Sequence, residues 1–428
     1  MPTIHIVGAG LSGLSCATHA ATTGFNVIVY EAAGHAGGRA RSFYDESLGC
    51  IIDNGNHLLL GANKTTRTYL AEIDAADSIR EISPAVFPFL DFKSGKRWGI
   101  RPGKIFPPIW IFSSKRRIPH TRPMEYFSQI IRLRRAGEAE TVADAVGTES
   151  LLFNTLWQPM STAVLNTDAT EASASLLWRV IKETFVRGEK ASRPWYFPNG
   201  LGEALVRPAQ DFLTAKGVHI RFSKRLREIR CSEHRVKSLI FSDDVIPLDR
   251  RDAVVLAVPP EACRRIFPVI KAPSDAKTIV NAHFRLENTP SLPGNGPFLG
   301  LINAETHWIF VRDNIVSLTV SAADAIADEP GHQIANRLWI EASAVLRYPL
   351  KCPPAWRIIK ERRATFAQNP TQVNARPVTT TGVENLFLAG DWTDTGLPAT
   401  IEGSILSGFR AAKLAGEKVK FAVYTDTK

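Results

Sequence analysis

The sequence has few cysteines and no long apolar run. Its five cysteines are scattered along 428 residues without a CxxC pair, which argues against a zinc site or a disulfide framework and fits a reducing compartment. No apolar stretch reaches the ~20 residues that a membrane-spanning helix needs. A signal peptide is not expected either, because residues 3–7 predict a strand that leads directly into a glycine turn. These features predict a cytoplasmic protein.

The composition predicts a folded protein with an anionic partner. Apolar residues make up 44% of the chain and charged residues 22%, which is the balance of a globular protein. The length exceeds that of one ordinary core, so we expect two domains. The net charge of +10 indicates nucleic acid, a membrane or a phosphate-bearing ligand. No stacking platform or recognition motif accompanies the basic residues, so nucleic acid is not expected as a partner.

A glycine motif near the N-terminus predicts dinucleotide binding. Gly8, Gly10 and Gly13 are spaced as GxGxxG between a predicted buried strand and a predicted helix. Such glycines allow a tight turn, a close approach to a pyrophosphate and packing of helix on sheet. Glu31 ends the next predicted strand, where a carboxylate can accept hydrogen bonds from a ribose hydroxyl. The alternative is a glycine-rich turn without a ligand, but the register of all these elements favours the dinucleotide.

A second glycine motif separates flavin from nicotinamide binding. Gly38, Arg39 and Arg41 follow shortly after Glu31, and guanidinium groups suit a phosphate anion. Together with the first motif, this segment resembles the FAD-binding signature of the flavin amine oxidase and phytoene desaturase superfamily. The resemblance extends to the C-terminal segment NLFLAGDWTDTGLPATIEGSILSGFRAA.

The resemblance assigns roles to that C-terminal segment. It implies that Asp391 bonds the ribityl or pyrophosphate region of FAD, and that the backbone of residues 399–402 lies under the isoalloxazine ring. The N-terminus of the following helix would favour the negative charge of a reduced flavin. The alternatives are that Glu402 only caps this helix and that Trp392 belongs to the core.

The resemblance also implies the fold and a set of site residues. The expected class is α/β: a discontinuous Rossmann-like FAD-binding domain with an inserted mixed α+β substrate domain, as in the amine oxidases. We expect the FAD-binding domain in residues 1–75, 198–267 and 382–428, and the substrate domain in 76–197 and 268–381. The residues expected to bind FAD non-covalently are Gly8, Gly10, Ser12, Gly13, Glu31, Ala32, Gly38, Arg39, Arg41, Gly55, Asn56, His57, Leu226, Gly390, Asp391, Ala399, Thr400 and Ile401.

The segment IIDNGNHLLLGAN places polar residues in an otherwise apolar stretch directly after the arginine motif. In the superfamily this loop runs along the flavin. Together with LWQPMSTAVLNTDATEASASLL and TGLPATIEGSILSG, the segment looks like that of the hydroxysqualene dehydroxylases of bacterial hopanoid biosynthesis. Asn56 and Asn63 depart from the Gln and Tyr expected there.

This resemblance implies that a long-chain isoprenoid alcohol is the substrate. Hydroxysqualene would lose its allylic hydroxyl and gain a hydride, giving squalene, while an external electron donor reduces FAD. His57 is our candidate for the acid that protonates the leaving oxygen, and Asp53 for its orienter or a cation stabiliser. Alternatively, Asp53 bonds backbone amides at the loop turn, and His57 makes a core hydrogen bond or touches FAD.

Other functions remain open from the sequence. A carotenoid or phytoene desaturase, or an amine oxidase, would run the same flavin in the oxidising direction. A non-catalytic prenyl-binding protein would share the fold without using flavin. Five aromatic residues could line a cation-tolerant pocket or belong to the core: Trp157, Trp178, Trp195, Tyr196 and Phe197.

A basic segment at residues 91–140 mixes Lys and Arg with Ile, Phe and Trp. It predicts a contact with a membrane surface, because a C30 isoprenoid stays in the bilayer and must be collected there. The alternative is a solvated loop and helix face. We therefore expect peripheral association with the inner face of the membrane.

Overall fold

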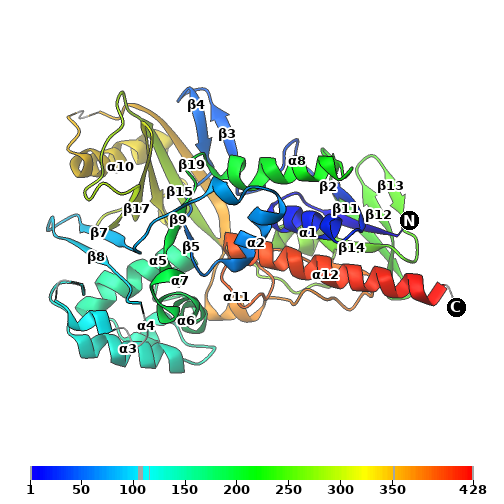
Figure 1. The fold of residues 1–428 in the computed structure, drawn as a ribbon, viewed down its shortest axis with the longest axis horizontal. Coiled ribbons are helices and arrows are strands. Elements are labelled where there is room, and N and C mark those ends of the chain that lie inside the picture. The colour runs from blue at the N-terminus through cyan, green and yellow to red at the C-terminus, as the bar shows by residue number, and fades with distance from the viewer. Residues whose placement is uncertain (1, 105–108, 115, 350–351, 427–428) are drawn as a thin grey trace.

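The molecule has two halves, each built around its own sheet. The computed structural model describes residues 2–104, 109–114, 116–349 and 352–426. Figure 1 shows an elongated shape in which both termini lie in one half, and α3 and α10 lie in the other. Within the described ranges, no helix is long and apolar enough to cross a membrane.

A five-stranded sheet forms the core of the half with the termini. Its strands in spatial order are β10 (Ile220–Arg221), β2 (Asn26–Tyr30), β1 (Thr3–Val7), β14 (Ala253–Leu256) and β20 (Leu386–Leu388), and all pair in parallel. Helix α1 (Leu11–Thr22) connects β1 to β2. The predicted strand–helix–strand unit is confirmed, and the parallel order is that of a Rossmann-like fold.

Alternate residues of this sheet face opposite layers. Ile4 and Ile6 of β1 pack against α1 and the long C-terminal helix α12 (Ile401–Asp426), which lie side by side. Val7 packs instead with the antiparallel strands β11 (Leu226–Ser232), β12 (Arg235–Phe241) and β13 (Val245–Pro247). The period of two therefore buries both faces of β1, as a continuous apolar strand predicts.

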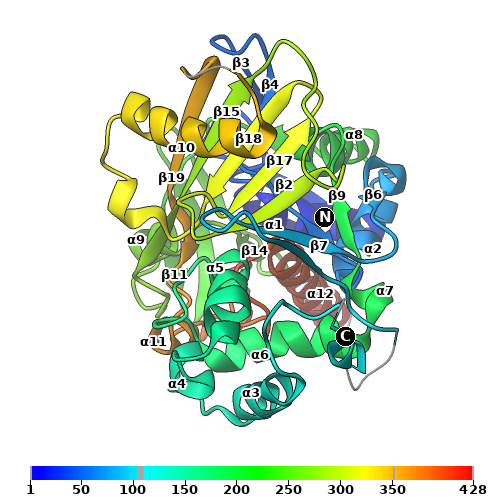
Figure 2. The ribbon, with the colours of Figure 1, turned by 90° about the vertical axis from the view of Figure 1, so that its left-hand side faces the viewer.

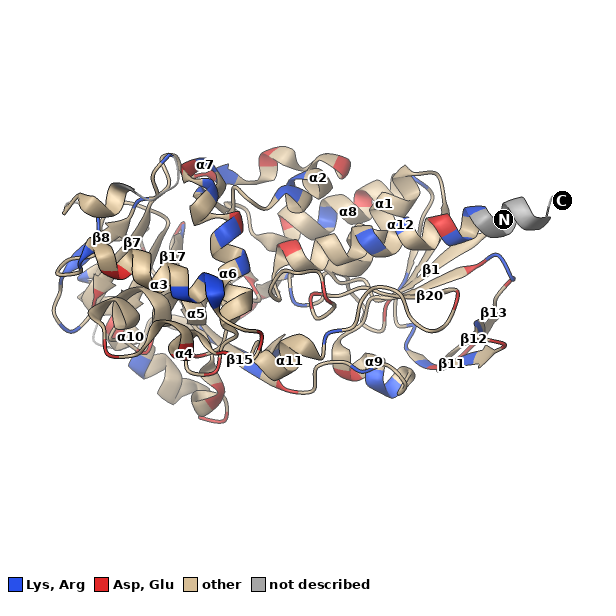
Figure 3. Ribbon diagram, turned by 90° about the horizontal axis from the view of Figure 1, so that it is seen from below, with Lys and Arg blue, Asp and Glu red and all other residues tan. Residues whose placement is uncertain are grey.

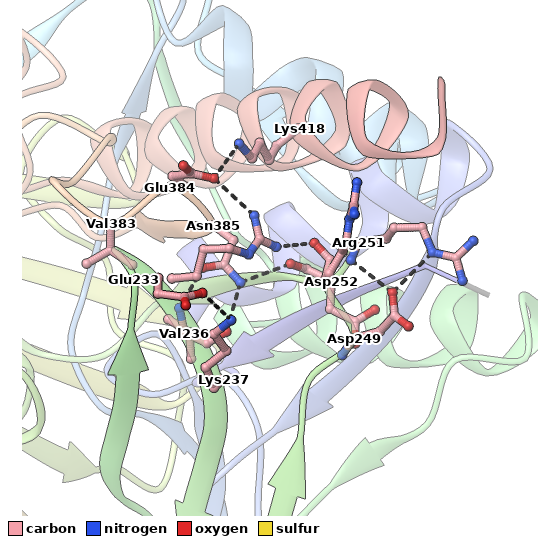
Figure 4. A network of polar contacts seen from close by, with 12 residues as sticks. Glu233, Val236, Lys237, Asp249, Arg251, Asp252, Val383, Glu384, Asn385 and Lys418 are labelled. Carbon is pink, nitrogen blue, oxygen red and sulfur yellow. Dashed lines mark hydrogen bonds and ion pairs between the residues drawn. The ribbon is translucent and has the colours of Figure 1, made fainter. Parts of the chain in front are cut away.

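A buried asparagine joins the antiparallel strands to the parallel sheet (Figure 4). The Asn385 Oδ1 atom accepts from the backbone amide of Val236 at 2.8 Å, and Nδ2 donates to the carbonyl of Asp252 at 3.1 Å. Glu384 pairs with Lys418 of α12 at 3.1 Å. These contacts fix three segments that are far apart in the sequence.

A seven-stranded sheet forms the core of the other half. Its strands in spatial order are β19 (Ala355–Phe366), β15 (Ala276–Arg285), β18 (Ile315–Val320), β17 (Trp308–Arg312), β16 (Phe298–Ile302), β7 (Phe87–Asp91) and β8 (Arg97–Ile100). Helix α10 (Gly331–Leu346) buries Leu338 and Trp339 against one face. Figure 2 shows helices α3 to α6 below the strands β15, β17 and β18.

These helices and the shorter elements complete the fold. The helices are α2 (Lys64–Glu72), α3 (Pro123–Arg135), α4 (Val142–Val146), α5 (Gln158–Leu165), α6 (Ala174–Glu183), α7 (Glu189–Ser192), α8 (Arg207–Ala215), α9 (Pro260–Ile266) and α11 (Pro370–Asn374). The short strands are β3 (Ser42–Asp45), β4 (Cys50–Asp53), β5 (Leu59–Leu60), β6 (Arg80–Glu81) and β9 (Pro194–Tyr196). Short helical turns lie at Ala76–Ser78, Ile109–Phe112, Phe153–Trp157, Phe185–Arg187, Gly202–Val206 and Ala323–Ile326.

Candidate active site

One large cavity connects the two halves. Its volume is about 1640 Å³, which exceeds the ~300–1,000 Å³ of an ordinary small-molecule pocket. It runs from the glycine motif after β1 to the aromatic side chains of β7 and β17. The cavity is therefore large enough for a dinucleotide and a second ligand.

The glycine end of the cavity has the form of a cradle. A Cβ atom at Gly8, which has φ of +107°, would lie 2.3 Å from the carbonyl oxygen of Ala257. A Cβ atom at Gly13 would lie 1.8 Å from the carbonyl oxygen of Gly8, so Gly13 packs α1 against the turn. A Cβ atom at Gly10 would meet no atom within 4 Å, because Gly10 faces the cavity. The open space at Gly10, before the N-terminus of α1, fits a pyrophosphate.

Glu31 lies at the end of β2, on the wall of this cradle. Its Oε2 atom accepts from the amide of Ala9 at 2.7 Å, and Oε1 accepts from the amide of Ala33 at 2.8 Å. Each carboxylate oxygen has a second lone pair. The side chain is therefore fixed at the cavity wall and retains acceptor capacity for a ribose hydroxyl.

The arginine motif meets the C-terminal segment. Arg39 donates from Nη2 to both carboxylate oxygens of Asp391 at 2.8 Å, and it also bonds the carbonyl of Ala364. Asp391 raises the pKa of Arg39 above its ordinary value, although burial opposes this. Arg41 bonds His35 at 2.9 Å. Arg39 and Asp391 thus form a charged pair on the cavity wall, a contact that the sequence did not predict.

The N-terminus of α12 also faces the cavity, through Ala399, Thr400 and Ile401. Glu402, in the first turn of α12, accepts from the amides of Thr65 at 2.9 Å and Thr66 at 2.8 Å. It therefore caps α2 and not its own helix, which corrects the alternative that we drew from the sequence.

The remaining expected cofactor residues are close together in space. All of them except Gly13 line the cavity, including Ser12, Ala32, Gly38, Gly55, Asn56, Leu226 and Gly390. Trp392 is buried and donates from Nε1 to the carbonyl of Val258 at 2.9 Å. Trp392 therefore packs in the core, as the second alternative held, and it also contributes to the cavity lining.

Asp53 lies outside the cavity lining and joins three segments. Its carboxylate accepts from Ser42 Oγ at 2.5 Å, from the amide of Leu201 at 2.9 Å and from Arg312 Nη1 at 2.6 Å. These partners occupy the carboxylate, and no hydrogen bond to His57 is formed among the described residues. The geometry corrects the expected role as an orienter, and the amide of Leu201 fits the alternative of a backbone contact.

The side chain of His57 is exposed, and it lines the cavity. Among the described residues, no hydrogen bond to the imidazole is formed. Burial lowers the pKa of His57 below its ordinary value of 6.5, and the Asp53 carboxylate opposes this only in part. The direction of this pKa shift favours the neutral imidazole, which faces the cavity where a ligand can contact it.

The far end of the cavity is apolar and aromatic. Its wall includes Phe87, Phe89, Leu156, Met160, Val164, Val180, Phe185, Trp308 and Phe310. The five aromatic residues proposed from the sequence do not line it. Trp157 and Trp178 pack among the helices, and Trp195 and Phe197 pack beside the parallel sheet. A signal for the true lining was present, because FPF at 87–89 and WIF at 308–310 place aromatics two residues apart on strands.

The fold and the cavity define a flavin-dependent oxidoreductase of the amine oxidase class. A family described as flavin containing amine oxidoreductase matches residues 11–415, so the chain belongs to that family. The structure of cyclohexylamine oxidase from Brevibacterium oxydans is similar, with a TM-score of 0.69 at 17% identity over 98% of this chain and 99% of that chain. This likeness shows the fold.

Closer relatives narrow the family. The chain is 40% identical to the hydroxysqualene dehydroxylase of Sinorhizobium fredii, over 96% of this chain and 98% of the relative. It is also 40% identical to the hydroxysqualene dehydroxylase of Rhodopseudomonas palustris, with the same coverage. The chain therefore belongs to the hydroxysqualene dehydroxylases.

Proposed function

We propose that this chain removes the hydroxyl group of hydroxysqualene with FAD as cofactor and releases squalene. The observation that carries this proposal is the continuous cavity, which joins a dinucleotide cradle to an apolar chamber. The identity of 40% to hydroxysqualene dehydroxylases over nearly the full length supports the same substrate.

The residues of the cradle fit FAD and would hold it non-covalently. Gly10 would give the pyrophosphate access to the N-terminus of α1, and Glu31 would accept from the adenosine ribose. The pair of Arg39 and Asp391 offers a fixed charge and an acceptor beside the ribityl chain. When bound and reduced, FAD supplies the hydride. We propose an external electron donor, because the sequence contains one glycine-rich dinucleotide motif.

The reaction breaks a C–O bond, forms a C–H bond and releases water, so the leaving oxygen must gain a proton. We propose His57 as the acid, because its imidazole is exposed to the cavity and has no competing partner within the described residues. Asn56 precedes it and also lines the cavity.

The apolar wall has two roles in this proposal. Trp308, Phe310 and Phe89 exclude water, and their ring faces favour an allylic cation that forms as the oxygen departs. An apolar chamber also accepts an isoprenoid chain from lipid with little change in hydrophobic free energy.

We also propose the two domains that the sequence indicated, with the same bounds. The strands of the parallel sheet and of β11 to β13 all fall in residues 1–75, 198–267 and 382–428. All seven strands of the second sheet fall in residues 76–197 and 268–381.

We further propose that the basic segment contacts the inner face of the membrane. Phe112, Met124 and Ile131 are large apolar side chains that are 57%, 68% and 47% exposed. Arg132, Arg134 and Arg135 follow in the last turn of α3. Helix α3 packs on α6, which lines the cavity through Val180 and carries further basic residues (Figure 3). The membrane contact would then lie beside the apolar end of the cavity.

The test is a single turnover with reduced enzyme. Anaerobically photoreduced holoenzyme is mixed with hydroxysqualene, flavin re-oxidation is followed by absorbance, and the product is identified by mass spectrometry. We expect re-oxidation with one squalene per flavin. Reduction of oxidised enzyme by squalene or phytoene, without re-oxidation by hydroxysqualene, would instead identify a desaturase. A purified protein that binds no FAD would indicate a prenyl-binding protein.

A further inference from the structure

A buried polar cluster lies in the part of the cavity wall that β15 and β18 of the second sheet form. Asn281 of β15 lies directly opposite Thr319 of β18, and the two residues are only 2% and 7% exposed. Both line the cavity. Burial of an amide and a hydroxyl is unfavourable unless both are hydrogen bonded, so the hydrogen-bond partners of these two side chains must be identified.

The hydrogen bonds of the cluster have a fixed direction. Asn281 donates from Nδ2 to the backbone carbonyl of Asn54 at 3.2 Å, and a carbonyl can only accept. The Oδ1 atom of Asn281 therefore faces Thr319, whose single hydroxyl proton it accepts at 2.8 Å. Thr319 Oγ1 can then only accept from Asn56, and Asn56 Nδ2 donates to it at 3.2 Å. This series of hydrogen bonds thus fixes which amide atom of Asn56 is the oxygen and which is the nitrogen, an assignment that would otherwise be ambiguous.

This orientation leaves two groups of Asn56 without a partner in the described ranges: the Oδ1 acceptor and the second N–H of the amide. The side chain is half-buried and lines the cavity next to His57. A ligand in the cavity can therefore meet an acceptor and a donor beside the imidazole.

Gly55 makes this arrangement possible. A Cβ atom at position 55 would lie 3.1 Å from Asn281 Nδ2, which is tighter than ordinary packing. The absence of a side chain lets the loop approach β15, so that the carbonyl of Asn54 and the amide of Asn56 both reach the cluster.

We propose that Asn56 binds the oxygen of the substrate hydroxyl, and that Thr319 and Asn281 are the residues that position it. The proposal rests on the proposed function. An alcohol donates one hydrogen bond and has two acceptor lone pairs, so it can pair with the free Oδ1 and N–H of Asn56 and still accept from His57. After the C–O bond breaks, the oxygen leaves as water and can still donate to Oδ1. The hydrocarbon product offers neither group, so the site favours the alcohol over its own product.

The test compares three threonine variants. Thr319→Val removes the hydroxyl and keeps the shape, whereas Thr319→Ser retains the hydroxyl. Thr306→Val is the matched control, because Thr306 is fully buried and its Oγ1 has no hydrogen-bond partner within the described residues. Dissociation constants of hydroxysqualene and squalene are measured on oxidised holoenzyme from the change in flavin absorbance, with FAD affinity and thermal unfolding measured beside them.

We expect Thr319→Val to lose the preference for the alcohol by about three- to tenfold, the effect of one ordinary hydrogen bond. Thr319→Ser and Thr306→Val should keep the preference. An unchanged preference in Thr319→Val would overturn the proposal, and so would a loss confined to FAD affinity, since Asn56 would then serve the cofactor. If reduced wild-type enzyme is not re-oxidised by hydroxysqualene, the proposed function itself fails, which is seen before any variant is made.

Discussion

The glycine end and the apolar end of the cavity differ in what their walls are made of. At the glycine end, backbone atoms and fixed charges face the ligand, and Gly8, Gly10 and Glu31 come from one strand–helix–strand unit. At the apolar end, side chains form the wall, and they come from β7, β17, α5 and α6. The first end is a rigid local structure, while the second depends on the assembly of segments that are distant in the chain.

Substitutions at the two ends of the cavity should therefore differ in the size of their effects. The backbone at Gly8 and Gly13 leaves no room for an extra atom, whereas a wall of side chains can adjust its packing. The largest effects are therefore expected at the glycine end and the smallest where solvent or the membrane is in contact.

The largest effect is expected for Gly13→Ala. The added Cβ would lie 1.8 Å from the carbonyl oxygen of Gly8, so α1 must separate from the turn. Gly10→Ala is the matched change, because its Cβ meets no protein atom. We expect Gly13→Ala to prevent folding, and Gly10→Ala to fold but to lose at least about tenfold in FAD affinity, or ~1.4 kcal/mol.

Thermal unfolding of the apoproteins and FAD titration measure the two effects. Wild-type FAD affinity in Gly10→Ala would show that the pyrophosphate does not lie at this turn.

His57→Gln should have the next largest effect. Glutamine retains a hydrogen-bonding side chain but cannot act as a comparable acid, so flavin re-oxidation by hydroxysqualene should slow by about 10²-fold. Substrate affinity and flavin reduction by an external donor should hardly change, because the proton is needed only as the C–O bond breaks. Stopped-flow absorbance separates these steps. Re-oxidation at nearly the wild-type rate would make His57 a structural residue.

Removal of charge near the apolar end should weaken membrane binding. Arg116→Ala with Arg117→Ala should lower the binding to anionic liposomes by ~2 kcal/mol, or roughly thirtyfold, at ~1 kcal/mol per charge. Lys115, the neighbouring cation of the basic segment, lies outside the described residues. The control is Arg225→Ala with Arg227→Ala at the cofactor end, which changes the net charge equally. Equal losses in both pairs would indicate a general charge effect and not a docking surface.

A further prediction is a pH dependence. Because burial lowers the pKa of His57 below 6.5, the imidazole gains its proton only as the pH falls through that lowered pKa. The re-oxidation rate should therefore increase by about tenfold per pH unit on going down from pH 8, and level off below the lowered pKa. His57→Gln should lose this dependence. A wild-type rate that is flat or falls toward acid pH would contradict protonated His57 as the acid.

The sequence predicted the glycine end well and the apolar end poorly. The GxGxxG spacing, the strand before it and Glu31 are local patterns whose geometry follows from the backbone. The pairing of Arg39 with Asp391 and of Asp53 with Arg312 depends on segments that meet only in the folded chain. Ion pairs between such distant segments cannot be predicted from the local pattern of the sequence.

The aromatic residues show the same limit. Trp157 and Trp195 are residue types that often line pockets, yet both rings are buried in the core. Their indole N–H groups donate to the buried Gln129 and to the exposed Glu81. Phe87 and Phe89 are less distinctive by type, but their strand places both beside the cavity. Residue type alone did not determine which aromatic residues line the cavity, because this depends on where the strands of the sheet place their side chains.

Glu402 has a mechanical consequence. It lies in the first turn of α12, which lines the cavity, while its carboxylate accepts from two amides in the first turn of α2. Helix α2 follows the short strand β5, and β5 follows the segment that carries Asn56 and His57. One carboxylate therefore ties two segments of the cavity wall together, so a displacement of α2 would be passed to the first turn of α12.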